Sequence, residues 1–330
     1  MAYRLLGRVG DAEDEVQEAW LRWREVDRAT VMDDRAYLTQ VTTRLAIDRL
    51  RREQRRRETY VGPWLPEPVA LEPDVADRVE LADSVEMALL VVLETLSPLE
   101  RAVFVLREAF GAPYEEIALV VDRSEDAVRQ LAHRARQHVD ERRPRFDADP
   151  RTRREVTERF LAAAAGGDVD ALMELLAPDV TLVSDGGGVV RAALRPIEGA
   201  DAVARWLAGV AARGLAEPSM EIVELNGGPA AVVRSRGELQ AAIVLGVAGG
   251  RVRAIYLVAN PDTLSRLEVC SGRCHDGASA VVSSSGRRSR RRWERCTRPP
   301  ERSPRSNGSW SSAPCCSRAS EGTARRWGRP

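Results

Sequence analysis

Residues 124–139 carry the side chains whose types and spacing offer the clearest chemistry in this chain. Ser124 is placed as a helix N-cap, and apolar residues follow at helical spacing, so the opposite face is left to polar side chains. Arginine and glutamine on such a face can meet guanine and adenine edges bidentately, and outer arginines can hold phosphates. The pattern therefore indicates nucleic-acid binding by Arg129, Gln130, His133, Arg134 and Arg136.

These donors need a scaffold, and the preceding residues predict one. The segment 114–121 reads as a short helix with Ile117, Ala118 and Val121 on one face. A supporting helix, a three- or four-residue turn and a donor-rich second helix form a helix-turn-helix suited to the major groove. An ordinary helical hairpin with a solvated basic face fits the periodicity equally well, and the neighbouring segments favour the first interpretation.

The stretch 96–139 resembles region 4 of bacterial sigma factors of the extracytoplasmic-function type. The matching motifs are Leu96-Ser97-Pro98, Tyr114-x-Glu116-Ile117-Ala118, Ser124-Glu125-x-x-Val128-Arg129 and His133-Arg134-Ala135-Arg136. Asp122 stands where a turn glycine is common, and aspartate tolerates the left-handed conformation better than most residues. The resemblance implies that Ser124 and the five donors named above bind the −35 promoter element.

An arginine run closes a second predicted helix, over residues 34–57, in which Leu38, Val41 and Leu45 face inward. Taken alone, such a run is more often a solvated face than a binding site. The segment from Ala36 onward resembles sigma regions 2.3 and 2.4, which bind and open the −10 element. The resemblance implies −10 contacts from Arg44, Arg49, Arg51, Arg52 and Arg55, with Arg56 and Arg57 completing the run.

Residues 2–18 resemble sigma regions 2.1 and 2.2, through Ala2-Tyr3-Arg4-Leu5-Leu6-Gly7 and Asp11-Ala12-Glu13-Asp14. A helix beginning at about Asp11 would carry this motif. In the family this helix docks on the largest polymerase subunit, which implies core-polymerase contacts from Asp14, Glu15, Gln17, Glu18 and Trp20. Because Met1 falls inside the region 2.1 pattern, we expect the chain to be N-terminally truncated or its start misassigned.

Residues 58–83 form a linker rich in proline and acid. Three prolines within six residues exclude a regular helix, while Trp64 and Leu65 are too apolar for an idle tether, so we expect them to dock. The run Trp64-Leu65-Pro66-Glu67-Pro68 resembles the linker of sigma-J-like proteins, which carry a fused C-terminal SnoaL-like domain. The resemblance assigns these five residues to regulation.

Residues 150–267 predict two helices, a strand, a third helix over 200–211 and four strands that end near Val258. Helices followed by an antiparallel meander indicate an α+β cone of the SnoaL/NTF2-like kind. The sigma-J-like group has two motifs in this domain, found here as Asp185-Gly186-Gly187-Gly188 and Asn260-Pro261-Asp262. Asp185 is a candidate general base in a pocket; a tight glycine loop is the favoured alternative, since no His or Tyr partner stands out nearby.

Composition restricts the remaining classes. Net charge is zero, but residues 268–330 hold 14 Arg against 5 acidic residues, and the first 267 residues are correspondingly acidic. All five cysteines lie after residue 267, which suits a reducing cytosol for the rest. All 50 basic residues are arginine, as in proteins from GC-rich, actinobacterial genomes. No apolar run is long enough for a membrane span, and Cys270, Cys274 and His275 are a weak metal motif.

The sequence thus predicts a multidomain protein with two all-α sigma domains followed by an α+β cone. The expected domains are region 2 (1–57), the linker (58–83), region 4 (84–143), the SnoaL-like domain (150–267) and a disordered or frameshifted basic tail (268–330). The expected function is promoter recognition with core RNA polymerase in the cytoplasm, regulated by the C-terminal domain, with no catalytic residue, metal or cofactor. The alternative is a SnoaL-like enzyme, or a sensor of an unidentified small ligand, with a DNA-binding arm.

Overall fold

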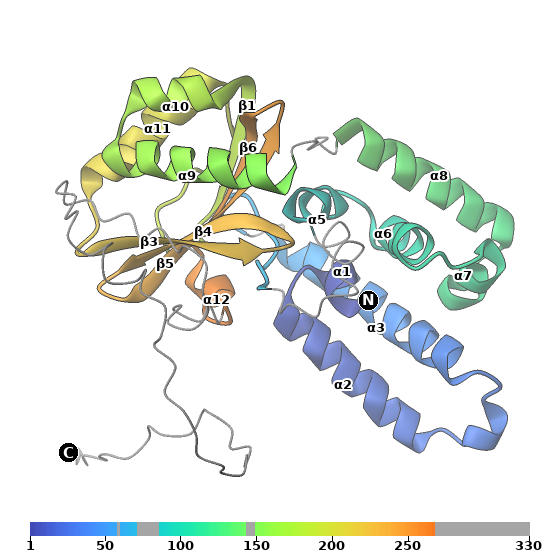
Figure 1. The fold of residues 1–330 in the computed structure, drawn as a ribbon. Coiled ribbons are helices and arrows are strands. Elements are labelled where there is room, and N and C mark those ends of the chain that lie inside the picture. The colour runs from blue at the N-terminus through green and yellow to red at the C-terminus, as the bar shows by residue number, and fades with distance from the viewer. Residues whose placement is uncertain (58–59, 71–85, 143–148, 268–330) are drawn as a thin grey trace, which may run out of the picture. The chain divides into compact units, whose positions relative to one another are not determined.

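The computed structural model describes residues 1–57, 60–70, 86–142 and 149–267 (Figure 1). The predicted tail and its cysteine motif lie outside the described residues. Two folding patterns follow one another along the chain, first helices alone and then helices with a sheet, so the predicted fold class is confirmed.

The first helical group comprises α1 (Ala2–Leu6), α2 (Val9–Glu25), a 3-10 turn (Arg28–Thr30) and α3 (Asp34–Arg57). Gly7 ends α1 in the left-handed conformation that glycine adopts at little cost. The α2 helix begins at Val9, two residues before the predicted Asp11, whereas α3 has the predicted bounds. Ala46, Ile47 and Leu50 bury the inner face of α3.

The second helical group contains α5 (Met87–Leu93), α6 (Pro98–Phe104), a π-helical turn (Val105–Ala109), α7 (Tyr114–Val121) and α8 (Glu125–Arg142). Ser97 and Glu100 form a capping box at the start of α6, with Pro98 at its first position. Asp122 ends α7 with φ 55°, as the sequence predicted for this turn. Buried residues of both helical groups belong to one hydrophobic core, in which Leu5 and Ile47 join Ile117 and Val128.

The α+β part begins with α9 (Pro150–Gly166) and α10 (Val169–Leu175), and α11 (Ala200–Arg213) follows later. These helices cover one face of a six-stranded sheet (Figure 1). The strands are β1 (Leu176–Asp185), β2 (Ile197–Glu198), β3 (Pro218–Leu225), β4 (Gly228–Ser235), β5 (Glu238–Ala248) and β6 (Arg251–Val258). Their order is β2-β1-β6-β5-β4-β3, and α12 (Pro261–Leu264) follows β6.

Strands β3 to β6 form the predicted antiparallel meander, paired from Pro218↔Ser235 to Ala248↔Arg251. Two features were not predicted: β1 pairs with β6 in parallel, and β2 pairs with β1. A two-residue strand carries too little periodicity to be seen in a sequence, and the parallel pairing joins segments about seventy residues apart.

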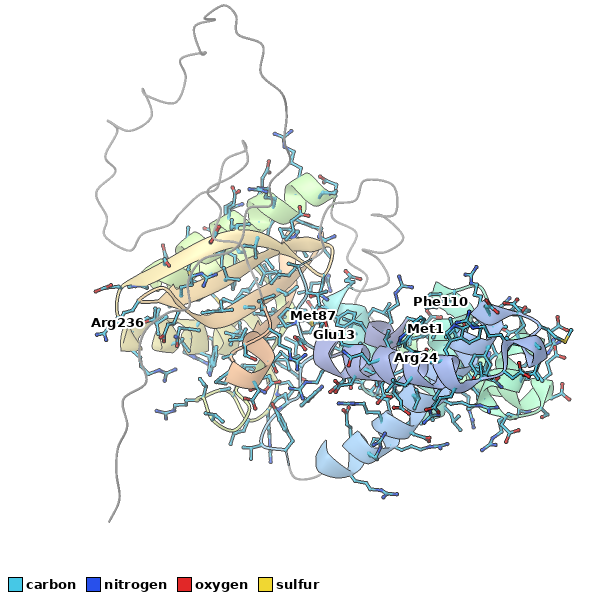
Figure 2. The ribbon with its side chains drawn as sticks, turned by 90° about the horizontal axis from the view of Figure 1, so that it is seen from below. Met1, Glu13, Arg24, Met87, Phe110 and Arg236 are labelled. Carbon is cyan, nitrogen blue, oxygen red and sulfur yellow. The ribbon has the colours of Figure 1, made fainter. Side chains whose placement is uncertain are left out.

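The face of the sheet that the helices leave open is covered from elsewhere in the chain. Leu65 of the linker and Met87 and Ala88 of α5 pack there against strand residues that include Val232 and Tyr256. Met87, labelled in Figure 2, is almost completely buried. The predicted docking of the linker is therefore visible as an apolar contact with this face.

Candidate nucleic-acid interface and linker contacts

The second helix of the helix-turn-helix, α8, presents the predicted donors to solvent. The Ser124 hydroxyl accepts from the Ala127 amide (3.3 Å), as expected for an N-cap. Val128, Ala132 and Ala135 are buried against the helical core, so the polar face points outward. The exposed residues on that face are Arg129, Gln130, His133, Arg134 and Arg136.

Carboxylates accompany the arginines on this face. Arg129 pairs with Glu125 one turn earlier, Arg136 pairs with Glu108, and Arg134 lies 3.6 Å from Glu100. The Arg129 and Arg136 pairs are exposed, where attraction is weak and screened by salt, whereas the Glu100 side chain is 23% exposed and also forms the capping box of α6. The arginines are therefore held in solvent-facing positions by partners that phosphates can replace.

Tyr114, the first residue of α7, contacts two arginines on the same surface. The guanidinium carbons of Arg107 and Arg129 lie 4.6 and 5.3 Å from its ring centroid. A cation over an aromatic face is attracted by the ring quadrupole. The sequence argument did not give Tyr114 this role, although its place four residues before Ala118 in the motif was noted.

The arginines predicted for the −10 element separate into groups. Arg51, Arg52 and Arg55 are exposed on α3 and form a basic strip on its second half. Arg44 is committed elsewhere: its guanidinium donates to the carbonyl oxygens of Val120 (2.9 Å) and Leu119 (3.1 Å) at the end of α7. The structure therefore joins Arg44 to the helix-turn-helix, and the sequence gave no sign of this contact.

Arg49 also has an intramolecular role. Its guanidinium forms ion pairs with four carboxylates. The nitrogen–oxygen distance is 3.2 Å to Glu15 and 3.4 Å to both Asp14 and Glu53, and Asp11 is the fourth partner. Burial alone would lower the pKa of Arg49, but the carboxylates around it raise that pKa above its ordinary value. In this structure the Arg49 guanidinium joins α2 to α3, and its side chain is 23% exposed.

The predicted polymerase-binding residues also divide. Glu15 is buried and accepts from Arg49 at 3.2 Å, so we correct its placement on a docking surface. Trp20 is 56% exposed, and Val16 and Leu21 beside it are similarly open. Asp14 and Gln17 are exposed and Glu18 is half-buried. Val16, Trp20 and Leu21 thus form an open apolar strip on a charged helix.

Asp185, the candidate general base, is 1% exposed, and both of its carboxylate oxygens accept hydrogen bonds. Its carboxylate accepts from the Tyr60 hydroxyl, from the Leu65 amide (3.0 Å) and from the Gly187 amide (2.9 Å). Burial, and then the hydrogen bond to Asp185, raise the pKa of the Tyr60 hydroxyl well above its usual range. A tyrosine partner for Asp185 therefore exists, 125 residues away in the linker, where sequence reasoning did not look.

The two cone motifs converge on the same linker segment. Asn260 donates to the Tyr60 hydroxyl (3.1 Å), and its side-chain oxygen accepts from the Asp262 amide to cap α12, with Pro261 at the first helical position. A Cβ on Gly187 would lie 2.5 Å from that oxygen. Gly186 could not accept one without meeting the Val190 carbonyl, and Gly188 has φ 72°. The glycine loop is thus required by close packing.

The rest of the linker motif is buried with it. Trp64 makes an edge contact with the Tyr60 ring (centroids 5.1 Å apart), and Arg8 lies 4.7 Å from the Trp64 ring centroid. Leu65, Pro66, Glu67 and Pro68 are all buried. A small hollow of about 10 Å³ lies between α5 and the sheet, lined partly by Met87, Arg153 and Tyr256. That volume is far below the few hundred cubic ångströms of a typical ligand pocket.

The fold and these surfaces define a helix-turn-helix protein whose DNA-facing helices are joined to an α+β cone. Family models agree in each part: residues 1–56 match sigma-70 region 2, residues 86–139 match sigma-70 region 4, and residues 157–263 match a SnoaL-like domain.

Two relatives from Mycobacterium tuberculosis extend over most of the chain. The sigma factor SigJ is 42% identical over 275 residues, covering 79% of this chain and 88% of SigJ. The probable sigma factor SigI is 36% identical, covering 81% of this chain and 91% of SigI. The crystal structure of SigJ superposes with a TM-score of 0.65 at 39% identity, covering 81% of this chain and 95% of that one.

The chain therefore belongs to the extracytoplasmic-function sigma factors of RNA polymerase, with a SnoaL-like domain fused as in SigJ. Its function is promoter-specific transcription initiation, and its partners are core RNA polymerase and promoter DNA. Among the residues that the structure describes, every helix falls short of the length and apolarity that a membrane span requires.

Proposed function

We propose that α8 reads the −35 element and that the basic strip of α3 holds the −10 DNA. The support is geometric: Arg129, Gln130 and Arg134 are exposed on the solvent face of the second helix of a helix-turn-helix, which is the helix that enters the major groove. Arg51, Arg52 and Arg55 form an exposed strip suited to phosphates. In the same proposal α2 docks on core polymerase through Trp20 and its neighbours, in the cytoplasm.

We further propose that the SnoaL-like domain is a regulatory anchor and not a catalyst. The observation that carries this proposal is the buried Asp185 carboxylate, which accepts hydrogen bonds from Tyr60 and Leu65 of the linker. A general base must lie within reach of substrate, but Asp185 is 1% exposed and the sheet face beside it is covered by Leu65 and Met87. The alternative enzymatic function therefore loses the residue on which it depended.

The contacts of Arg44 indicate what this anchor regulates. Arg44 and Gln40 of α3 donate to backbone carbonyls at the end of α7, and one hydrophobic core holds residues from both helical groups. Promoter elements centred near −10 and −35 lie about 25 base pairs apart, roughly 85 Å at ~3.4 Å per base pair. Helices that share a core cannot span that distance, so the arrangement with these contacts formed is a closed one that must open on a promoter.

Transcription with purified core polymerase on a template carrying a recognised promoter tests the regulatory proposal. Asp185→Asn should change promoter output because it weakens the acceptor for Tyr60 and Leu65, and Trp64→Ala should reproduce part of that change. Truncation after about residue 145 should also alter output. The matched control is Asp179→Asn, an exposed acid on the same strand that pairs with Arg253. Output equal to wild type in all three test variants would show that the domain has no regulatory role.

A further inference from the structure

The start of α2 has no cap of its own. Arg8 occupies the N-cap position in extended geometry, with φ −130° and ψ 133°, and makes no side-chain cap hydrogen bond. The first amides of a helix have no partner within that helix and need acceptors from elsewhere. In this chain an acceptor comes from the linker: Oε2 of Glu67 accepts from the Val9 amide at 3.0 Å, across 58 residues of sequence.

Hydrogen bonds of its backbone also hold Glu67 against α1. Its own amide donates to the Gly7 carbonyl (2.8 Å), and its carbonyl accepts from the Tyr3 hydroxyl (2.8 Å). Its side chain is 3% exposed. Burial raises the pKa of the Glu67 carboxyl, while the Val9 amide and the nearby Arg8 and Arg266 act in the opposite direction. The side chain is therefore held at the helix start and is not a surface group that happens to lie there.

The same contacts continue into the SnoaL-like domain. Asn226, in the turn between β3 and β4, donates to the Tyr3 hydroxyl (2.9 Å), and it exchanges two hydrogen bonds with Val69 of the linker. Arg266, just after α12, lies 3.5 Å from Glu13 of α2, which Figure 2 labels. A Cβ on Gly10 would meet the Arg266 guanidinium. The first turn of α2 is thus enclosed by side chains of the linker and the cone.

We propose that Glu67, a linker residue distant in sequence, is the N-terminal cap of α2, and that it positions α2 for polymerase binding. A negative side chain at a helix N-terminus satisfies an amide and complements the helix dipole. The acid in the first turn of α2, Asp11, is paired with Arg49. Release of Glu67 from α1 and the start of α2 would remove the cap from the helix that carries Trp20. This inference rests on the proposed docking of α2 on core polymerase.

The test uses the full chain with Glu67→Ala, and measures amide hydrogen exchange at residues 9–12. The Val9 amide should lose its protection. The Ala12 amide, which makes the first intrahelical bond to the Arg8 carbonyl (3.1 Å), should exchange about fivefold faster, as expected for the loss of one helix cap. The Leu65 amide, bonded to Asp185, should stay protected, which separates a lost cap from an undocked linker.

A rescue variant distinguishes capping from mere packing. Arg8 already has N-cap geometry, so Arg8→Asn supplies a local cap in the Glu67→Ala background. It should restore slow exchange at Ala12 but not at Val9, whereas Arg8→Ala in that background should restore neither. Affinity for core polymerase should fall about threefold to fivefold in Glu67→Ala and recover with Arg8→Asn but not with Arg8→Ala.

Several results would overturn the inference. Unchanged Ala12 exchange in Glu67→Ala, or equal behaviour of the two Arg8 variants, would refute the capping role. Altered exchange with unchanged polymerase affinity would refute the positioning role. Trp20→Ala separates the underlying proposal: if it leaves polymerase affinity unchanged, the docking of α2 fails, while the exchange results still decide whether Glu67 caps the helix.

Discussion

The Asp185 contact and the face of α8 use the same chemistry, a carboxylate beside a donor, in opposite surroundings. Asp185 is 1% exposed and holds three donors. The side chains of Glu125 and Arg129 are 43% and 58% exposed, and water competes with their pairing. A buried acceptor cannot lose its donors without leaving polar groups unsatisfied, whereas an exposed pair exchanges partners at little cost.

Burial separates the contacts that hold the protein together from those that are open to a partner. The linker and the cone are joined by hydrogen bonds from the Tyr60 hydroxyl and the Leu65 amide to the buried Asp185 carboxylate. The arginines of α8 are held loosely by glutamates that a phosphate or a base edge can replace. We therefore expect the linker to stay bound to the cone, and the arginines of α8 to exchange their glutamate partners for DNA.

The largest expected effect is at Asp185. Asp185→Ala removes the acceptor of the buried Leu65 amide and of the Tyr60 hydroxyl, and leaving such groups unsatisfied should lower the local opening free energy by about 3 kcal/mol. Exchange of the Leu65 amide should then accelerate by roughly a hundredfold. Asp179→Ala, on the same strand but exposed, should leave it nearly unchanged. Equal Leu65 exchange in the two variants would remove the distinction drawn above.

The next effect is on α8. Arg129→Ala and Arg134→Ala should each weaken specific binding to −35 DNA by roughly fivefold to a hundredfold if they contact base edges. Arg151→Ala, an exposed arginine at the start of α9, is the control and should leave binding as it was. Electrophoretic or fluorescence titration of the promoter fragment measures this. Wild-type affinity in both α8 variants would show that this face does not read DNA.

How far the sequence predicted these features depends on the distance over which each is determined. Helical periodicity and local caps gave α7 and α3 their bounds and α8 its start, whereas α8 continues past the predicted Val139 to Arg142; the left-handed turn at Asp122 followed from its residue type. Apolar runs between turn signals placed the meander strands to within two residues. All of these depend on interactions within a few residues of one another.

The errors and omissions are at contacts between distant segments. Glu15 has the residue type and position of a surface contact, yet it is buried because Arg49 meets it across two helices. Tyr60 was not recognised as a partner of Asp185, and Arg44 was not recognised as a donor to α7. Nothing in the local pattern marks these pairs, because a charged residue in an amphipathic helix looks the same whether it faces water or another segment.

The basic strip of α3 is exposed like the face of α8, and we expect it to contact DNA phosphates. Neutralising Arg51, Arg52 and Arg55 should reduce the slope of log affinity against log salt by about one for each lost phosphate contact. The measurement is DNA binding at several salt concentrations. A slope identical to that of the wild type would mean that the strip is only a solvated face.

The smallest effect should have the opposite sign. Glu125→Gln removes the exposed partner of Arg129, and since the pair is exposed, its loss should hardly change the stability of α8. Binding of −35 DNA should strengthen slightly, by less than about threefold, because Arg129 is released and one negative charge leaves a surface that faces phosphates. Glu155→Gln, which removes the exposed partner of Arg151 on α9, is the matched control and should not alter DNA binding. A marked loss of affinity in Glu125→Gln would show instead that Glu125 positions Arg129 for base contact, and the exposed pair would then resemble the Asp185 contact in function although not in burial.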